Sequence, residues 1–167
     1  MHIRFERPED APGIHDLHRA AFGSALEGDI VDALRTAGTA LVSLVAVDDA
    51  EIVGHILFSP VTLTGADDMQ IAALGPMAAL PDRQRRGIGS ALVNSGIEEC
   101  RRRGVQAVFV VGHAEYYPRF GFVQAVRFGI SCEFNVADDV FMVLELVEGA
   151  LQGRAGVVHF HEAFQMS

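Results

Sequence analysis

A short turn rich in glycine and arginine has the residue types and the spacing that phosphate binding requires. It runs from Gln84 to Ser90 and precedes a segment of helical apolar periodicity that ends at Gly104. The first turn of a helix offers free backbone N–H groups and the positive end of the helix dipole, and both favour a phosphate group. Gly87 and Gly89 lack Cβ atoms, so the backbone can approach a ligand closely. The turn therefore predicts a phosphate-binding loop at the start of a helix.

Two common phosphate loops do not fit this spacing. A P-loop has Lys and then Ser or Thr after its last glycine, whereas Ser90 and Ala91 follow here. A dinucleotide fingerprint, G-x-G-x-x-G, needs Gly or Ala at its last position, where this chain has Leu92. The pattern that does fit is Q-x-x-G-x-G, which begins at Gln84. Binding of a nucleotide phosphate by this turn is therefore disfavoured. It ranks third among the hypotheses for the function, after the two given below.

An aromatic segment supplies groups that can move a proton. It runs from Tyr116 to Phe122 (YYPRFGF) and follows the apolar run 106–112, which is predicted to be a strand buried on both faces. Ligands of open α/β sheets bind just past the carboxyl ends of such strands. A phenol has a pKa of about 10, so it stays protonated at neutral pH and can act as a general acid. The segment is therefore the second candidate for chemistry.

The remaining elements must hold these two motifs in place. Periodicity and turn residues predict strands at 3–6, 41–47, 52–63, 69–80, 106–112, 126–131 and 140–146, and helices at 10–22, 26–37 and 88–103. Asp10 is the predicted N-cap of the first helix. The strand–helix–strand unit 69–112 is a crossover with a parallel pair. We therefore predict one α+β domain, residues 1–167, with a mostly antiparallel sheet that is parallel only at the crossover and is flanked by helices.

The composition narrows the classes of function. The chain has 167 residues, a net charge of −9 and 50% hydrophobic residues, which fits a globular protein with a sizeable core. An acidic chain with one basic turn does not fit nucleic-acid binding, and no apolar run is long enough to span a bilayer. The N-terminal residues lack the apolar core of a signal peptide, so a cytoplasmic location is expected. Cys100 and Cys132 have no metal-ligand spacing, and no metal is expected.

The two motifs together resemble those of the GNAT superfamily of acyl-CoA N-acyltransferases. Q-x-x-G-x-G at Gln84 is similar to the family's acyl-CoA pyrophosphate loop, and YYPRFGF is similar to its C-terminal aromatic block. The resemblance covers residues 3–146 and is strongest to a bacterial subgroup of predicted N-acetyltransferases that share the tail beginning at Phe141. It implies a GNAT-type mixed sheet, acetyl-CoA as cosubstrate, and transfer of the acetyl group to a primary amine by direct attack. A homodimer is compatible with the sequence.

The resemblance also implies roles for individual residues. Tyr117 aligns with the tyrosine that protonates the departing thiolate. His113 stands where many members have Asn, and it is a candidate general base or a cap of the short aromatic helix. The strand end at 77–80 would pair with pantetheine, the loop amides would hold the pyrophosphate, and Arg83, Arg85 and Arg86 add positive charge there. The implied cofactor-binding residues are Met77, Ala78, Ala79, Leu80, Gln84, Arg85, Arg86, Gly87, Ile88, Gly89, Ser90, Tyr116 and Phe120.

A second hypothesis from a different class remains open. A catalytically silent CoA-binding sensor or interaction module would carry the same phosphate loop. Tyr117 in register favours the enzyme, whereas the lack of an assigned general base favours the sensor. The acceptor carries no motif in the sequence, so its identity is not predicted.

Overall fold

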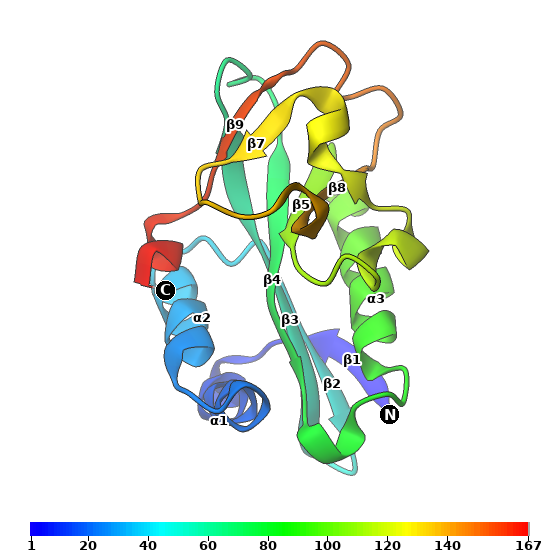
Figure 1. Cartoon of the computed structure of the whole chain (residues 1–167). Helices are drawn as coiled ribbons and strands as arrows, with labels where there is room; N and C mark the ends of the chain where they lie inside the picture. The colour runs from blue at the N-terminus through cyan, green and yellow to red at the C-terminus, as the bar shows by residue number, and fades with distance from the viewer. Residues whose placement is uncertain (167) are drawn as a thin grey trace. The chain divides into compact units, whose positions relative to one another are not determined.

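The computed structural model describes residues 1–166. The chain divides into two compact units, and each is described by itself. The first comprises 1–59, 75–99 and 162–166, and the second comprises 60–74 and 100–161. Strands β3 (Glu51–Leu63) and β4 (Ile71–Ala79) contribute residues to both (Figure 1). The single domain expected for residues 1–167 stays a prediction.

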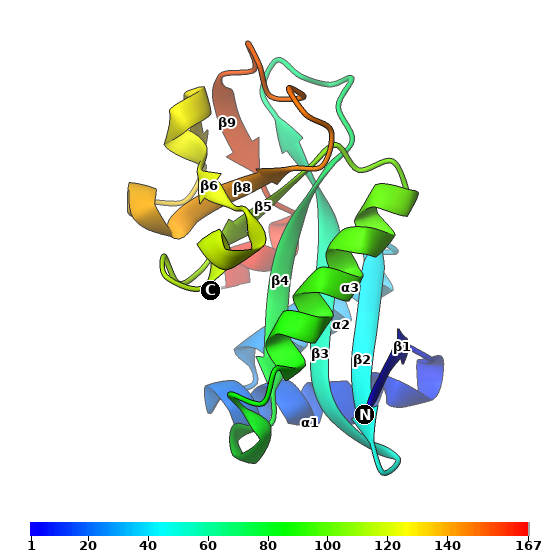
Figure 2. The ribbon, with the colours of Figure 1, turned by 90° about the vertical axis from the view of Figure 1, so that its right-hand side faces the viewer.

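The first unit is a sheet with helices on both faces. Its strands lie in the order β1 (His2–Phe5), β2 (Val42–Asp48), β3 and β4, and the β1–β2 and β2–β3 pairs are antiparallel. Helices α1 (Ala11–Phe22) and α2 (Leu26–Thr36) cover one face, and α3 (Ile88–Arg102) covers the other (Figure 1, Figure 2). The helices and strands predicted for this part of the chain are confirmed, with bounds that differ by one or two residues.

The two faces of this sheet are packed differently. Under α1 and α2, aliphatic side chains of both helices and of β2 and β3 form one buried cluster that includes Ile14, Val31, Leu34, Val45 and Leu57. On the other face, α3 contacts β3 closely at two glycines, one in the helix and one in the strand. A Cβ on Gly96 would lie 2.2 Å from Cε1 of Phe58, and a Cβ on Gly54 would lie 2.6 Å from Cγ2 of Ile88. These glycines let α3 lie directly on the strand.

Asp10 occupies the predicted N-cap position of helix α1. Asp10 precedes α1, but its side chain makes no cap bond to that helix. Its Oδ2 accepts the backbone N–H of Arg7 at 2.7 Å, and Arg4 donates to both carboxylate oxygens at 2.7 and 3.1 Å. The Arg4 guanidinium lowers the pKa of Asp10. The carboxylate therefore fixes the short turn before α1 to strand β1.

A chain of partly and fully buried polar side chains crosses the α1–α2 face. Arg35 donates to Glu6 at 2.6 and 2.9 Å, and the Ser43 hydroxyl donates to the same carboxylate at 2.6 Å. Because the Ser43 proton goes to the carboxylate, the Ser43 oxygen accepts from Nε2 of His55 at 2.8 Å. Nδ1 of His55 then accepts from Nε2 of His18 at 2.9 Å. Both imidazoles are fully buried, which favours their neutral forms, and the hydrogen bonds define their tautomers.

We expect acid to destabilise the fold through these two histidines. Burial, with a smaller effect of His55, lowers the pKa of His18 to about 3, and burial lowers the pKa of His55. The unfolded chain binds protons on these rings below about pH 6.5 while the folded chain does not, so stability falls as the pH drops through this window. For His18 alone, the loss between pH 7 and pH 5 is about 2 kcal/mol. Urea unfolding at both pH values measures it, and equal free energies of unfolding would contradict the expectation.

The second unit carries the other half of the sheet. Its strands lie in the order β3, β4, β5 (Ala107–Val111), β8 (Phe141–Glu145) and β6 (Val123–Gln124). The β4–β5 pair is parallel from Ile71 and Ala107 to Ala73 and Phe109, which confirms the predicted crossover. The β5–β8 and β6–β8 pairs are antiparallel. The buried core of this unit includes Phe109 and Phe141, whose stacked rings lie 5.6 Å apart.

Two features of the second unit differ from the prediction. Residues 126–128, expected to begin a strand at 126–131, belong instead to a 3-10 turn (Ala125–Phe128) that ends at Gly129 with a φ of +70°. Strand β7 covers only Ile130–Cys132. The tail forms strand β9 (Gly156–His159), which is parallel to β7 and antiparallel to β3. The sheet therefore has a second parallel pair besides the crossover. Nowhere in residues 1–166 is a helix both long enough and apolar enough to cross a bilayer.

Candidate active site

The end of β4 and the turn after it are held by hydrogen bonds within the first unit. The Leu80 N–H donates to the Val53 carbonyl at 3.0 Å, and Nε2 of Gln84 donates to the Ala79 carbonyl at 3.1 Å. Ala78 is buried, whereas its neighbours at 77, 79 and 80 are partly exposed. The parallel ladder with β5 ends at Ala73, so it uses no later backbone group of β4. A strand end of this kind can pair with an extended ligand.

The glycine and arginine turn has the backbone shape of an anion site. Arg85 and Gly87 both adopt left-handed conformations, with φ values of +66° and +81°. Helix α3 begins at Ile88, and the Ala91 N–H donates to the Gly87 carbonyl at 3.0 Å. The N–H groups before Ala91 therefore precede the first intrahelical bond of α3 and point out of its N-terminus. The turn and the dipole of α3 together favour a phosphate group at this point.

Arg83 does not share the role expected for the arginines of the turn. Its guanidinium lies 2.7 Å from Asp48 and 3.6 Å from Glu51. The hydrogen bond to Asp48 raises the pKa of Arg83, and the same bond lowers the pKa of Asp48. Neither Arg85 nor Arg86 forms an ion pair with any described residue, and both are exposed. The positive charge available to a ligand is therefore that of Arg85 and Arg86.

This difference between the arginines gives a test of the turn. Replacing Arg85 and Arg86 together by Gln should weaken CoA binding by about 2-fold to 30-fold, since each exposed ion pair contributes about 0.2–1 kcal/mol. CoA binding by this double variant should also depend less on salt than binding by the wild type, because salt screens the exposed charges that the variant lacks. Arg83→Gln is the matched control and should leave the affinity nearly unchanged. Calorimetry that finds Arg83→Gln to be the more damaging change would contradict this assignment.

The aromatic segment forms a compact ring cluster in the second unit. Tyr117 begins the 3-10 turn η3 (Tyr117–Phe120), and its ring lies 5.1 Å from that of Tyr116 and 5.6 Å from that of Phe122. A Cβ on Gly112 would lie 2.4 Å from Cε2 of Tyr117, so the glycine at the end of β5 makes room for this ring. Phe120 packs edge-on against Tyr116 at 5.2 Å. The predicted aromatic residues are thus brought together.

The Tyr117 phenol is protonated and free to donate. Only 7% of Tyr117 is exposed, and burial, with a smaller effect of Tyr116, raises the pKa of Tyr117 to about 12. Among the described residues, no group forms a hydrogen bond with the Tyr117 hydroxyl. Tyr116 differs, because it is less buried and the Arg119 guanidinium lies 4.8 Å from the centre of its ring. The environment of Tyr117 suits a proton donor better than that of Tyr116.

His113 does not cap the short turn. Its carbonyl accepts the Tyr116 N–H at 3.1 Å, but η3 begins after Tyr116 and receives no side-chain cap bond. The His113 side chain is exposed at the start of the aromatic segment. The capping interpretation of His113 is therefore wrong, and its role as a base stays a prediction. Gly112 was not predicted as a site residue, although its position directly after a buried strand was the signal for a close contact.

The comparisons with known proteins identify the family. The model of the acetyltransferase (GNAT) family matches residues 11–122. The uncharacterized N-acetyltransferase YhbS of Escherichia coli K12 is 36% identical over 165 residues, which cover 98% of each chain. The uncharacterized N-acetyltransferase YjhQ of the same organism is 44% identical over 117 residues, which cover 68% of this chain and 64% of YjhQ. The chain therefore belongs to the GNAT family of acetyltransferases.

Solved structures agree with this family. The crystal structure of E. coli YhbS in complex with CoA superposes with a TM-score of 0.94 at 36% identity, covering 98% of this chain and 91% of YhbS. A GNAT family acetyltransferase from Brucella melitensis in complex with acetyl-CoA gives a TM-score of 0.82 at 38% identity, covering 98% of this chain and 97% of that one. The predicted enzyme class, N-acetyltransferase, and the predicted α+β fold with its mixed sheet are confirmed.

Proposed function

We propose that the protein transfers the acetyl group of acetyl-CoA to a primary amine by direct attack. The amine nitrogen bonds to the thioester carbonyl carbon, the C–S bond breaks, the amine loses one proton and the thiolate gains one. The proposal rests on one observation: in the first unit, the end of β4, the glycine turn and the N-terminus of α3 follow one another directly. It is supported by relatives of the same family whose crystal structures hold CoA and acetyl-CoA.

Contacts within the first unit support most of the proposed cofactor-binding residues. The backbone at 77–80, which is the end of β4 and the residue after it, pairs with the pantetheine arm, because the β5 ladder ends at Ala73. The amides from Arg85 to Ser90 hold the pyrophosphate at the N-terminus of α3. Gln84 orients the turn through its bond to the Ala79 carbonyl. In the second unit, Tyr116 and Phe120 supply the aromatic lining.

Tyr117 is the proposed general acid. Its raised pKa keeps the hydroxyl protonated at every physiological pH, so the donor is present in each turnover. A thiol has a pKa of about 8.5, so the tyrosinate left after protonating the sulfur is the stronger base. It regains a proton from the amine or from the solvent, which closes the proton balance. His113 is the proposed base that removes the proton of the incoming ammonium group.

A direct assay tests the proposal. Incubation of the protein with acetyl-CoA and a pool of primary amines should release free thiol at a rate that depends on both the protein and the amines. Release that does not depend on any amine, together with tight CoA binding, would instead indicate a silent CoA-binding module.

A further inference from the structure

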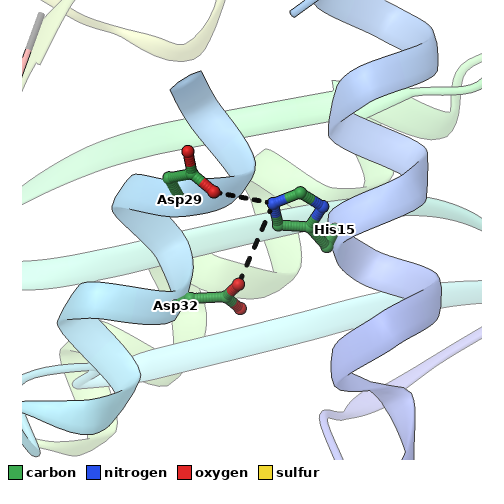
Figure 3. Close-up of side chains that lie close together, drawn as sticks. All are labelled: His15, Asp29 and Asp32. Carbon is green, nitrogen blue, oxygen red and sulfur yellow. Dashed lines mark hydrogen bonds and ion pairs between the residues drawn. The ribbon is translucent and has the colours of Figure 1, made fainter. Parts of the chain in front are cut away.

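Three metal-ligating side chains of the first unit converge between α1 and α2, outside the proposed cofactor site. His15 projects from α1, and Asp29 and Asp32 project from α2 towards its Nε2 atom (Figure 3). Nε2 of His15 lies 2.9 Å from Oδ1 of Asp29 and 3.9 Å from Oδ2 of Asp32. One ligand atom of each residue lies within 4.8 Å of the other two. Nothing in the acetyl-transfer chemistry uses these groups.

The position of the imidazole depends on a glycine in α2. A Cβ on Gly28 would lie 2.7 Å from Cδ2 of His15, so any other residue there would displace the ring. Asp29 and Asp32 are three residues apart, which places both carboxylates on one face of α2. The ring of His15 is therefore seated against α2 with the same nitrogen facing both carboxylates (Figure 3).

The charges around the cluster leave it anionic. Oδ1 of Asp32 accepts a hydrogen bond from Arg35 at 2.7 Å, which orients the carboxylate and leaves Oδ2 facing His15. The Arg35 charge is in turn balanced by Glu6, which it binds through two nitrogens. Asp32 thus shares the Arg35 cation with Glu6, so Glu6, Asp29, Asp32 and Arg35 together carry a net negative charge. About half of each side chain is exposed, so an ion in solution can reach them.

We propose that His15, Asp29 and Asp32 bind a divalent transition-metal ion of the Zn²⁺ type that joins α1 to α2. Zn²⁺ takes imidazole nitrogen at about 2.0–2.1 Å and carboxylate oxygen at about 2.0–2.2 Å, which sets neighbouring tetrahedral ligands roughly 3.4 Å apart. This separation falls between the two distances measured from Nε2 of His15. Mg²⁺ and Ca²⁺ prefer sites made of oxygen alone, so the imidazole selects the transition metal. Water completes the fourth position.

Metal binding to tag-free protein tests the site. Titration with Zn²⁺ should show one ion per chain, and Co²⁺ should give the visible absorption of a bound ion. Zn²⁺ at about one hundred times its Kd should raise Tm by about 5–10 °C, because the ion binds the folded chain only. His15→Gln and Asp29→Asn should each weaken binding at least tenfold. Asp16→Asn is the matched control, since Asp16 is exposed beside His15 on α1, and it should bind as the wild type does.

The decisive outcomes concern the variants. Each variant is first unfolded without metal, and only variants that retain a cooperative transition are titrated. Equal Zn²⁺ affinity in the wild type, His15→Gln and Asp29→Asn would overturn the proposal, as would the absence of saturable binding. In either case the cluster is only a hydrogen-bonded contact between the two helices.

Discussion

Tyr117→Phe should lower kcat by about 10²- to 10⁴-fold while leaving CoA affinity nearly unchanged. The change deletes one hydroxyl and keeps the buried ring in contact with Tyr116, Phe122 and the backbone of Gly112. Because no described group hydrogen-bonds to that hydroxyl, its removal leaves no broken contact in the fold. The loss should therefore fall on the chemical step. Steady-state kinetics with a known acceptor, together with calorimetry of CoA binding, would measure both quantities.

Tyr116→Phe is the control for this prediction. It removes a hydroxyl from the neighbouring ring, which is less buried and lies under Arg119. Its kcat should stay within a few-fold of the wild type. A near-normal kcat in Tyr117→Phe, or a larger loss in Tyr116→Phe, would remove Tyr117 from the role of general acid.

Of the predicted changes in stability, the largest loss is expected for Gly96→Val in the first unit. A Cβ at this position would lie 2.2 and 2.6 Å from two atoms of the Phe58 ring, which is fully buried and cannot move aside. Helix α3 must then shift from β3, and overpacking of this kind costs about 3 kcal/mol. For a chain of this length, Tm should fall by roughly 6–12 °C. Thermal unfolding of the two proteins would measure the shift.

Asn94→Val is the matched control on the same helix. Asn94 is exposed, so the new side chain meets solvent while the helix still gains a β-branched residue. Its Tm should change by less than about 2 °C. Equal Tm values for Gly96→Val and Asn94→Val would show that the contact between Gly96 and Phe58 does not limit the packing of α3.

The parts of the site that depend on local sequence could be predicted from it. The turn at Gln84–Ser90 and the helix after it need only a glycine pattern and an apolar period, and both are encoded within a few residues. Tyr117 was assigned through the resemblance of its motif, which follows the buried strand β5, to the family's aromatic block, and its role stays a prediction. The crossover followed from a strand, a helix and a strand in succession, since such connections place the two strands in parallel.

The rest depends on contacts between distant residues. The ion pair of Arg83 with Asp48 joins positions 35 residues apart, so charge composition alone assigned Arg83 to the ligand. Residues 125–128 are apolar enough for a strand, but the left-handed Gly129 closes a turn there. Strand β9 forms because β3 and β7 offer it partners, which its own short sequence does not indicate.

The packing glycines and the polar clusters also depend on contacts between distant residues, so local sequence does not predict them. Gly54 and Gly96 stand in a strand and a helix, where glycine has no local advantage, and only the approach of α3 to β3 explains them. His15 faces Asp29 and Asp32 because α1 and α2 pack side by side. The spacing of the two aspartates on one helical face was the available signal, but it did not identify the partner from α1.

The assay of thiol release from acetyl-CoA tests the central claim most directly. The protein is mixed with acetyl-CoA and a pool of primary amines, free thiol is followed with a colorimetric reagent, and the products are examined by mass spectrometry. The proposed function predicts thiol release that requires an amine, one acetylated amine for each thiol, and a strong reduction in Tyr117→Phe. Tight binding of CoA without any amine-dependent thiol release would contradict acetyl transfer to a primary amine.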